Sequence, residues 1–126
     1  MLPWDLEDWL TDEGDKVVRK AAVAGVDALT PEERLVFEVW LFDTEQRNGG
    51  VAHYFERGRE QWSSLCSVAR NVLAPFSDFA ERVDAVVANA QEPYLAVIQS
   101  GGALDRAYEE CQVALISALR ENGRRS

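Results

Sequence analysis

The chain has 126 residues, of which 47% are hydrophobic, and its formal net charge is −9 at pH 7. This length and hydrophobic share are typical of one folded domain that buries a core without help from disulfides or metals, and they exclude a disordered chain. Affinity for nucleic acid depends on neutralising phosphate charge. We therefore expect no direct nucleic-acid binding, and an attraction to basic protein surfaces instead.

The negative charge is concentrated in the first third of the chain. Residues 1–46 hold 12 Asp and Glu against 4 Lys and Arg, a net charge of −8, whereas residues 47–126 hold 10 against 9, a net charge of −1. Two interpretations remain open. The acids form either a solvated face that keeps the protein in solution or a surface for a basic partner.

The apolar runs are far shorter than the roughly 20 residues that cross a bilayer, so we expect no membrane association. The first residues, Met1 to Asp5, do not resemble a signal peptide, because an acidic residue stands where a basic region would precede an apolar stretch. Cys66 and Cys111 lie far apart in helical patterns. We read them as reduced, partly buried thiols of a cytoplasmic protein.

The helical pattern of apolar residues begins near the amino terminus, at Trp4. The pattern predicts a short helix from Trp4 to Leu10 and a second segment that opens at Thr11 or Asp15, with Gly14 as the point where a longer helix would break. If the stretch formed one continuous helix, a row of acids about 15 Å long would share one face. The members of this row are Asp5, Asp8, Asp12 and Asp15. Trp4 and Trp9, which lie among these acids, are candidates for an exposed contact patch.

The clearest helix start is the capping box Thr30-Pro31-Glu32-Glu33, in which proline occupies the first helical position. An apolar stripe follows and ends at Asn48-Gly49-Gly50, a strong stop signal. We expect further helices from residue 51 to Gly58, over the stripe from Trp62 to Leu73, and from a cap at Ser77 to a stop at Pro93. We also expect a turn at Gly101-Gly102 and a last helix from Leu104 to Asn122-Gly123, with residues 124–126 frayed.

No alternating strand pattern with hairpin signals occurs. The sequence therefore predicts an all-α fold, a single compact domain over residues 1–126 made of five to seven amphipathic helices.

Nothing in the sequence has the spacing of a catalytic or metal-binding motif. His53 is the one histidine, it has no companion set of metal ligands, and neither cysteine belongs to a CxxC pair. We expect no enzyme, no metal and no cofactor. An alternative is a small-ligand or enzymatic protein with a pocket at the Asn48-Gly49-Gly50 corner that uses His53, Tyr54 and Glu45.

Residues 45–55 carry a family resemblance. A helix that ends in E-x-x-N-G-G and is followed by a helix with an aromatic pair resembles the pattern of the DNA mimic protein 19-like family, helical bacterial proteins of mostly unknown function. The matching residues are Glu45, Asn48, Gly49, Gly50, Tyr54 and Phe55. The likeness covers residues 27–58 well and the rest loosely, including Leu104 to Tyr108 before the last helix. We expect these motif residues to be structural, with Glu45 bonding amides across the corner.

The resemblance implies an all-helical fold and, for the family's named member, a carboxylate surface that imitates DNA phosphates and occupies a transcription factor. The resulting hypothesis is a non-catalytic acidic module that binds a basic protein, such as a DNA-binding protein, as a monomer or homodimer. An immunity or antitoxin protein, which also neutralises a partner with acidic residues, is an alternative. The expected acidic face comprises Asp5, Asp8, Asp12, Asp15 and Glu38.

Overall fold

The computed structural model describes residues 2–125 of the chain, and the side chains of residues 2–124. All regular structure in this range is helical, which confirms the predicted all-α single domain. The elements are α1 (Trp4–Ala24), η1 (Val26–Ala28), α2 (Pro31–Tyr54), η2 (Phe55–Arg57), α3 (Glu60–Ala69), α4 (Ala74–Val87), α5 (Pro93–Gln99) and α6 (Ala103–Arg125), where η denotes a short 3₁₀ helix.

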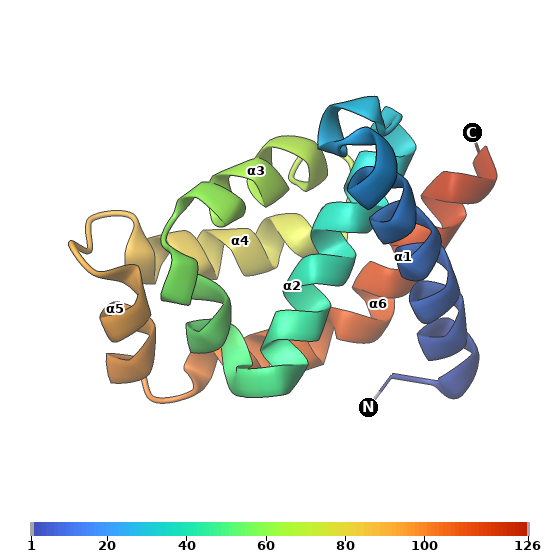
Figure 1. Cartoon of the computed structure of the whole chain (residues 1–126). Helices are drawn as coiled ribbons and strands as arrows, with labels where there is room; N and C mark the ends of the chain where they lie inside the picture. The colour runs from blue at the N-terminus through green and yellow to red at the C-terminus, as the bar shows by residue number, and fades with distance from the viewer. Residues whose placement is uncertain (1, 126) are drawn as a thin grey trace.

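Helix α2 lies at the centre of the molecule. It packs against α1, α3, α5 and α6, while α6 also packs against α4 and α1 (Figure 1). The buried ring of Phe42 on α2 meets the rings of Tyr54, Tyr108 and Phe79 at centroid distances of 4.7, 5.0 and 5.6 Å. Helices α1 and α5 occupy opposite ends of the molecule in Figure 1, so the acidic first helix lies far from α5.

The start of α2 confirms the predicted capping box. The hydroxyl of Thr30 accepts a hydrogen bond from the Glu33 amide at 3.1 Å, and the Glu33 carboxylate accepts one from the Thr30 amide at 2.9 Å. The same carboxylate forms an ion pair of 2.6 Å with Lys20 of α1. Capping therefore also ties the beginning of α2 to the end of α1.

Helix α1 corrects the prediction of a break at Gly14. It runs uninterrupted from Trp4 to Ala24, and Gly14 is buried on its inner face. A Cβ atom at Gly14 would lie 2.1 Å from Cδ1 of Trp40 and 2.6 Å from Cγ of the same ring. Glycine is present because the indole of Trp40 packs directly on the α1 backbone, so the residue marks a close approach of two helices and not a helix end.

Three predicted boundaries from α3 to α5 were wrong. Helix α3 ends at Ala69, which leaves Val72 exposed, and α4 already begins at Ala74 with Pro75 in its first turn. Ser77 therefore lies inside a helix and does not cap it. Pro93, predicted as a stop, begins the short helix α5. Proline suits a first turn because its missing amide proton has no intrahelical partner there.

The carboxyl end of the chain partly agrees with the prediction. Gly101 and Gly102 form the expected turn, with φ angles of 71° and 80°. Asn122-Gly123 does not end α6, which continues through Arg125. Arg124, expected in a frayed tail, forms an ion pair of 2.9 Å with Glu121 one turn earlier. Ser126, the last residue of the predicted tail, lies outside the described residues.

The contact at Gly14 gives a testable prediction. Glycine-to-alanine changes inside helices usually stabilise a protein by up to about 1 kcal/mol. Gly14→Ala should instead lower the free energy of unfolding by about 1–3 kcal/mol, because the added methyl group collides with the Trp40 ring. Gly123→Ala in α6 is the control, since a Cβ atom there would lie within 4 Å of no atom of the described residues. Urea unfolding measures both, and a stabilised Gly14→Ala variant would contradict the close approach.

Candidate functional site

The four aspartates of the predicted acidic row share the outer face of α1. All four are exposed, whereas Leu6, Leu10 and Val17 on the opposite face are buried in the core. Because the helix is continuous through Gly14, the row is unbroken over about 15 Å. Its members are Asp5, Asp8, Asp12 and Asp15, and we call this set the acidic row.

Only the ends of the acidic row have ion-pair partners among the described residues. Asp5 lies 3.7 Å from the Arg120 guanidinium of α6, and Asp15 pairs with Arg19 one turn along α1 at 3.0 Å. No ion pair within 4.0 Å is formed by Asp8 or Asp12 in the described part of the chain. Exposed pairs contribute little and are screened by salt, so the row keeps its negative character.

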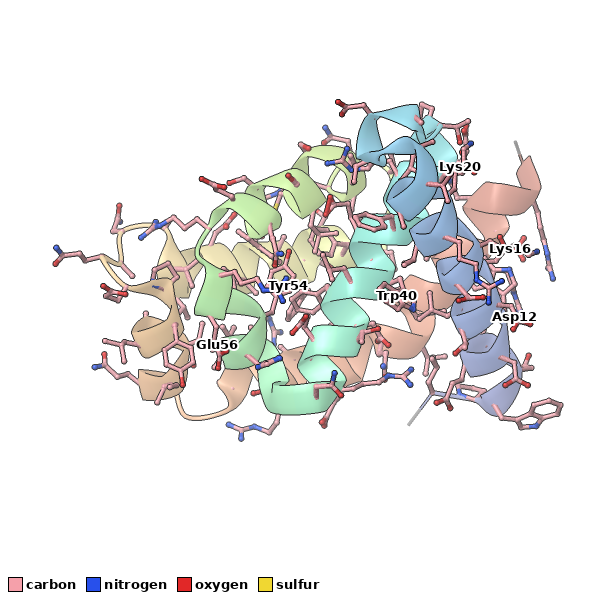
Figure 2. The ribbon with its side chains drawn as sticks, viewed as in Figure 1. Asp12, Lys16, Lys20, Trp40, Tyr54 and Glu56 are labelled. Atoms are coloured by element: carbon pink, nitrogen blue, oxygen red, sulfur yellow. The ribbon has the colours of Figure 1, made fainter. Side chains whose placement is uncertain are left out.

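The sign of the charge changes along α1. Residues 4–15 contain six acids and no base, whereas residues 16–24 contain Lys16, Arg19 and Lys20 and no acid. Figure 2 shows Asp12, Lys16 and Lys20 following one another along the helix. Acids near the amino end and bases near the carboxyl end both interact favourably with the helix dipole. The acids of α1 are thus restricted to the amino-terminal half of this helix.

A large aromatic side chain stands beside the acidic row. Trp4, at the start of α1, is 77% exposed, whereas Trp9 is partly buried and packs against the core. Of the two tryptophans predicted as a contact patch, Trp4 is therefore the one open to solvent. Exposed tryptophan is enriched at protein interfaces because it offers a large apolar area with few rotatable bonds.

Glu38 does not belong to the acidic face, which corrects that part of the prediction. It lies on an inner side of α2, is 4% exposed and forms an ion pair of 3.2 Å with Arg34. Burial raises the pKa of the Glu38 carboxyl above its usual value, and the hydrogen bond and charge of Arg34 oppose this rise only in part. The sequence placed Glu38 with the exposed acids because its burial depends on contacts of α2 with the rest of the fold.

The raised pKa of Glu38 predicts a pH dependence. The folded protein binds the proton of Glu38 more tightly than the unfolded chain does. The contribution of Glu38 to the free energy of unfolding therefore falls as the pH rises from the usual carboxyl pKa of about 4.3 through the raised pKa. Glu38→Gln removes the effect. The unfolding free energy of Glu38→Gln minus that of the wild type should therefore increase between pH 4 and pH 7.

Urea titrations across this pH range measure the difference. Glu60→Gln, at an exposed acid in the first turn of α3, is the control and should show no such trend. A difference that shrinks as the pH rises would mean that the pair with Arg34 outweighs burial.

A second buried carboxylate, Asp43, links three helices. It is 2% exposed, and its Oδ1 accepts hydrogen bonds from the Tyr108 hydroxyl at 2.5 Å and the Gln112 amide at 2.7 Å, both on α6. Its Oδ2 lies 2.7 Å from Nε of Arg47, whose Nη1 reaches Glu7 of α1 at 2.9 Å. Arg47, which lies outside residues 1–46, thus interacts with two of the acids counted there.

The Asn48-Gly49-Gly50 corner is a kink where two helical segments meet. Gly50 has a φ of 83°, which favours glycine, and a Cβ atom there would lie 3.0 Å from Oδ1 of Asp105. The same oxygen accepts a hydrogen bond from the Val51 amide at 2.7 Å and one from Gln46 at 3.4 Å. The chain's own Asp105 therefore occupies the position where the helix start could bind an anion.

Comparison with known proteins identifies the family. A family model described as DMP19-like protein matches residues 27–122 of the chain. The chain belongs to this family. No curated protein and no solved structure matches. The DMP19-like match includes residues 27–58, where the likeness was expected to be good, and continues as far as residue 122 in α6, where it was expected to be loose. It begins after α1 and so does not include the acidic row.

Within the DMP19-like part of the chain, the motif residues have structural surroundings. Tyr54 and Phe55 are each 1% exposed and belong to the aromatic core. Glu45 does not bond amides across the corner as predicted. Its Oε2 lies 2.6 Å from Nε2 of His53, and Asp105 takes the amide instead. Sequence reasoning missed Asp105, although it stands inside the Leu104 to Tyr108 segment that resembles the family.

The geometry around the corner gives the enzymatic alternative little support. The cavity that Asn48 lines is about 170 Å³ in volume, lies between α1 and α2 and does not include His53, Tyr54 or Glu45. The Tyr54 hydroxyl is buried and has no hydrogen-bond partner among the described residues, and burial raises the pKa of this hydroxyl. Figure 2 shows Tyr54 and Glu56 on the side of α2 away from the acidic half of α1.

The described residues offer neither a metal site nor a membrane-spanning helix. No group of three or more His, Cys, Asp or Glu side chains there is placed to hold a metal ion. No helix among them combines the length and apolar character needed to cross a membrane.

Asp105 offers a test of the corner. Asp105→Ala should lower the free energy of unfolding by about 1–3 kcal/mol, because it leaves the fully buried Val51 amide without an acceptor. Asp105→Asn should lose about half as much, since it keeps an acceptor but not the charge. Asp78→Ala, at an exposed acid of α4, should change little. Equal stability of all three variants would show that the carboxylate does not hold the kink.

Proposed function

We propose that this DMP19-like protein is a non-catalytic binding module that engages a basic protein through the acidic row and Trp4. A DNA-binding protein, whose basic surface faces phosphates, is the partner class that this surface suits best. The single observation that supports the proposal is the continuity of α1. Four outward carboxylates stand on one rigid helix, and the two central ones, Asp8 and Asp12, form no ion pair with the described residues.

The charge density of the row is close to that of a nucleic-acid strand. Four carboxylates over about 15 Å give one charge per roughly 5 Å of helix axis, whereas one strand of DNA carries one per roughly 3.4 Å. Lys and Arg side chains that read phosphates are long and flexible, so they can reach carboxylates at this spacing. Complementary charge of this kind speeds association and makes binding sensitive to salt.

Trp4 adds an apolar and aromatic contact to the same surface. Its indole is mostly exposed, which leaves apolar area unburied in the isolated chain. A partner that covers it would gain that area, and an arginine placed over the ring would gain a cation–π contact. Acids alone also serve solubility, but an exposed tryptophan among them does not, and this combination favours the binding interpretation.

The state of the thiols also supports a non-catalytic role. Burial raises the pKa of Cys66 and of Cys111 to about 11, so both remain protonated at neutral pH. A protonated thiol is a poor nucleophile. His53 is held by Glu45 at 2.6 Å and faces Glu56 at 3.6 Å, with neither cysteine within these contacts.

The decisive experiment captures partners from the source cell on the immobilised full chain. The wild type should retain a basic protein that salt releases. Asp8→Asn/Asp12→Asn should weaken this capture at least about tenfold, because two contacts to charged groups are lost. Captured proteins are identified by mass spectrometry, and the affinity of the purified partner is then measured by calorimetry at two salt concentrations.

The matched control is Asp27→Asn/Glu60→Asn, which changes the net charge by the same amount at exposed acids outside α1. This variant should bind like the wild type. If both double variants weaken capture equally, attraction depends on net charge alone and the acidic row is not the binding face. Trp4→Ala should weaken binding without changing its salt dependence.

A further inference from the structure

The outer face of α1 carries a pattern of charge that is complementary to itself. Each residue turns an α-helix by about 100°, so five exposed residues of α1 lie within an arc of about 80° on the side away from the core. They are, in chain order, Asp8, Asp12, Lys16, Arg19 and Val23. The arc is therefore acidic first, then basic, and apolar at its end. This order matches that of a second copy that runs in the opposite direction.

One register brings all the opposite charges together. A two-fold axis that crosses α1 near its midpoint places Asp8 level with Arg19 of the second copy, because the two residues lie at equal distances from that point. The same axis places Asp12 level with Lys16 of the second copy. Symmetry forms each of these pairs twice. Asp15, which lies close to the axis and so to its own copy, is compensated by Arg19 of its own chain at 3.0 Å.

The basic side chains of this face have only weak partners within their own chain. Lys16 lies 3.2 Å from Glu13, and its side chain is 71% exposed. Arg19 lies 3.0 Å from Asp15, and its side chain is 78% exposed. Exposed ion pairs of this kind contribute little to stability, so both bases can turn to a second acid at small cost.

The same register aligns the two most exposed large apolar side chains of the described residues. Val23 is 90% exposed and Trp4 is 77% exposed. They lie about 28 Å apart along α1, at equal distances from its midpoint. An antiparallel second copy therefore places each Trp4 level with a Val23. Removal of this apolar area from water favours association at both ends of the contact.

We propose that a second copy of this chain docks antiparallel on the outer face of α1 and covers the acidic row with its basic residues. A chain with a net charge of −9 repels its copies in most orientations, whereas on this face opposite charges meet. A helix face about 31 Å long and about 10 Å wide is smaller than the roughly 800 Å² per partner of a stable interface. The dimer is therefore weak and depends on concentration.

This inference goes beyond the proposed function and adds a consequence that rests on it. Asp8 and Asp12 cannot contact a second copy and a basic partner at the same time. The dimer therefore keeps the acidic row covered, and a basic protein binds only by displacing the second copy. Self-association and partner binding become competing equilibria of the same helix face.

The first test exchanges the charges of the face and follows the full chain by sedimentation equilibrium. Asp8→Lys/Asp12→Lys should raise the Kd of the dimer at least about tenfold, because it places like charges opposite each other. Lys16→Glu/Arg19→Glu should raise it as much for the same reason. An equimolar mixture of the two variants should dimerise again, since every pair in the mixed dimer has opposite signs.

Net charge alone predicts a different result. Asp8→Lys/Asp12→Lys takes the net charge from −9 to −5, which would strengthen association if overall repulsion governed it. Two controls change the net charge by the same amounts at exposed positions outside α1 and should change the Kd far less. They are Glu60→Lys/Glu81→Lys and Arg57→Glu/Arg82→Glu. Circular dichroism checks that each variant remains helical.

Three outcomes overturn the inference. The wild type remains monomeric at about 1 mM, either charge variant dimerises like the wild type, or the mixture of the two variants remains monomeric. Val23→Ser adds a variant without a change of charge at a side chain that is almost fully exposed. It should raise the Kd several-fold, and an unchanged Kd overturns the antiparallel register.

The second test separates this inference from the proposed function. Val23 lies outside the acidic row, so Val23→Ser should not weaken capture of a basic protein. Capture that depends on Asp8 and Asp12, together with a monomeric wild type, overturns the dimer and leaves the proposed function standing. Dimerisation that follows the charge exchange, without salt-sensitive capture of a basic protein, supports the dimer and overturns the proposed function.

Discussion

The buried carboxylate of Asp43 holds the central helix in place. It accepts hydrogen bonds from two α6 side chains, and Arg47 carries the connection on to Glu7 of α1. Burying a charge is costly unless every lone pair is satisfied, so this network defines one arrangement of α1, α2 and α6 and penalises others. The packing of Phe42 against Tyr108 depends on the same arrangement.

The acidic row depends on that arrangement through a close contact on the inner side of α1. Trp40 of α2 packs against the backbone at Gly14, which allows one helix to run past a residue that favours a break. A rigid helix then carries four carboxylates outward on one face. The surface proposed to bind a partner is thus a consequence of core packing on the opposite side of the same helix.

The corner that identifies the family has a different role from the acidic row. Gly50 and Asp105 form a closed structural unit in which a carboxylate from α6 caps a kink in α2. The family match covers this unit and begins after α1, so family membership accounts for residues 27–122 and does not include the acidic row. The two parts of the molecule can therefore be tested with separate variants, Asp105→Ala for the fold and Asp8→Asn/Asp12→Asn for the surface.

The sequence by itself determined the helical class, the capping box at Thr30 and Glu33, the kink at Gly49-Gly50 and the aspartate spacing on α1. Each of these follows from short-range rules of periodicity, capping and glycine conformation. Only the tertiary structure decided that α1 is continuous, that Glu38 is buried and that Asp105 caps the kink. Those facts depend on contacts between residues distant in the chain, such as Gly14 with Trp40 and Val51 with Asp105, which local patterns do not encode.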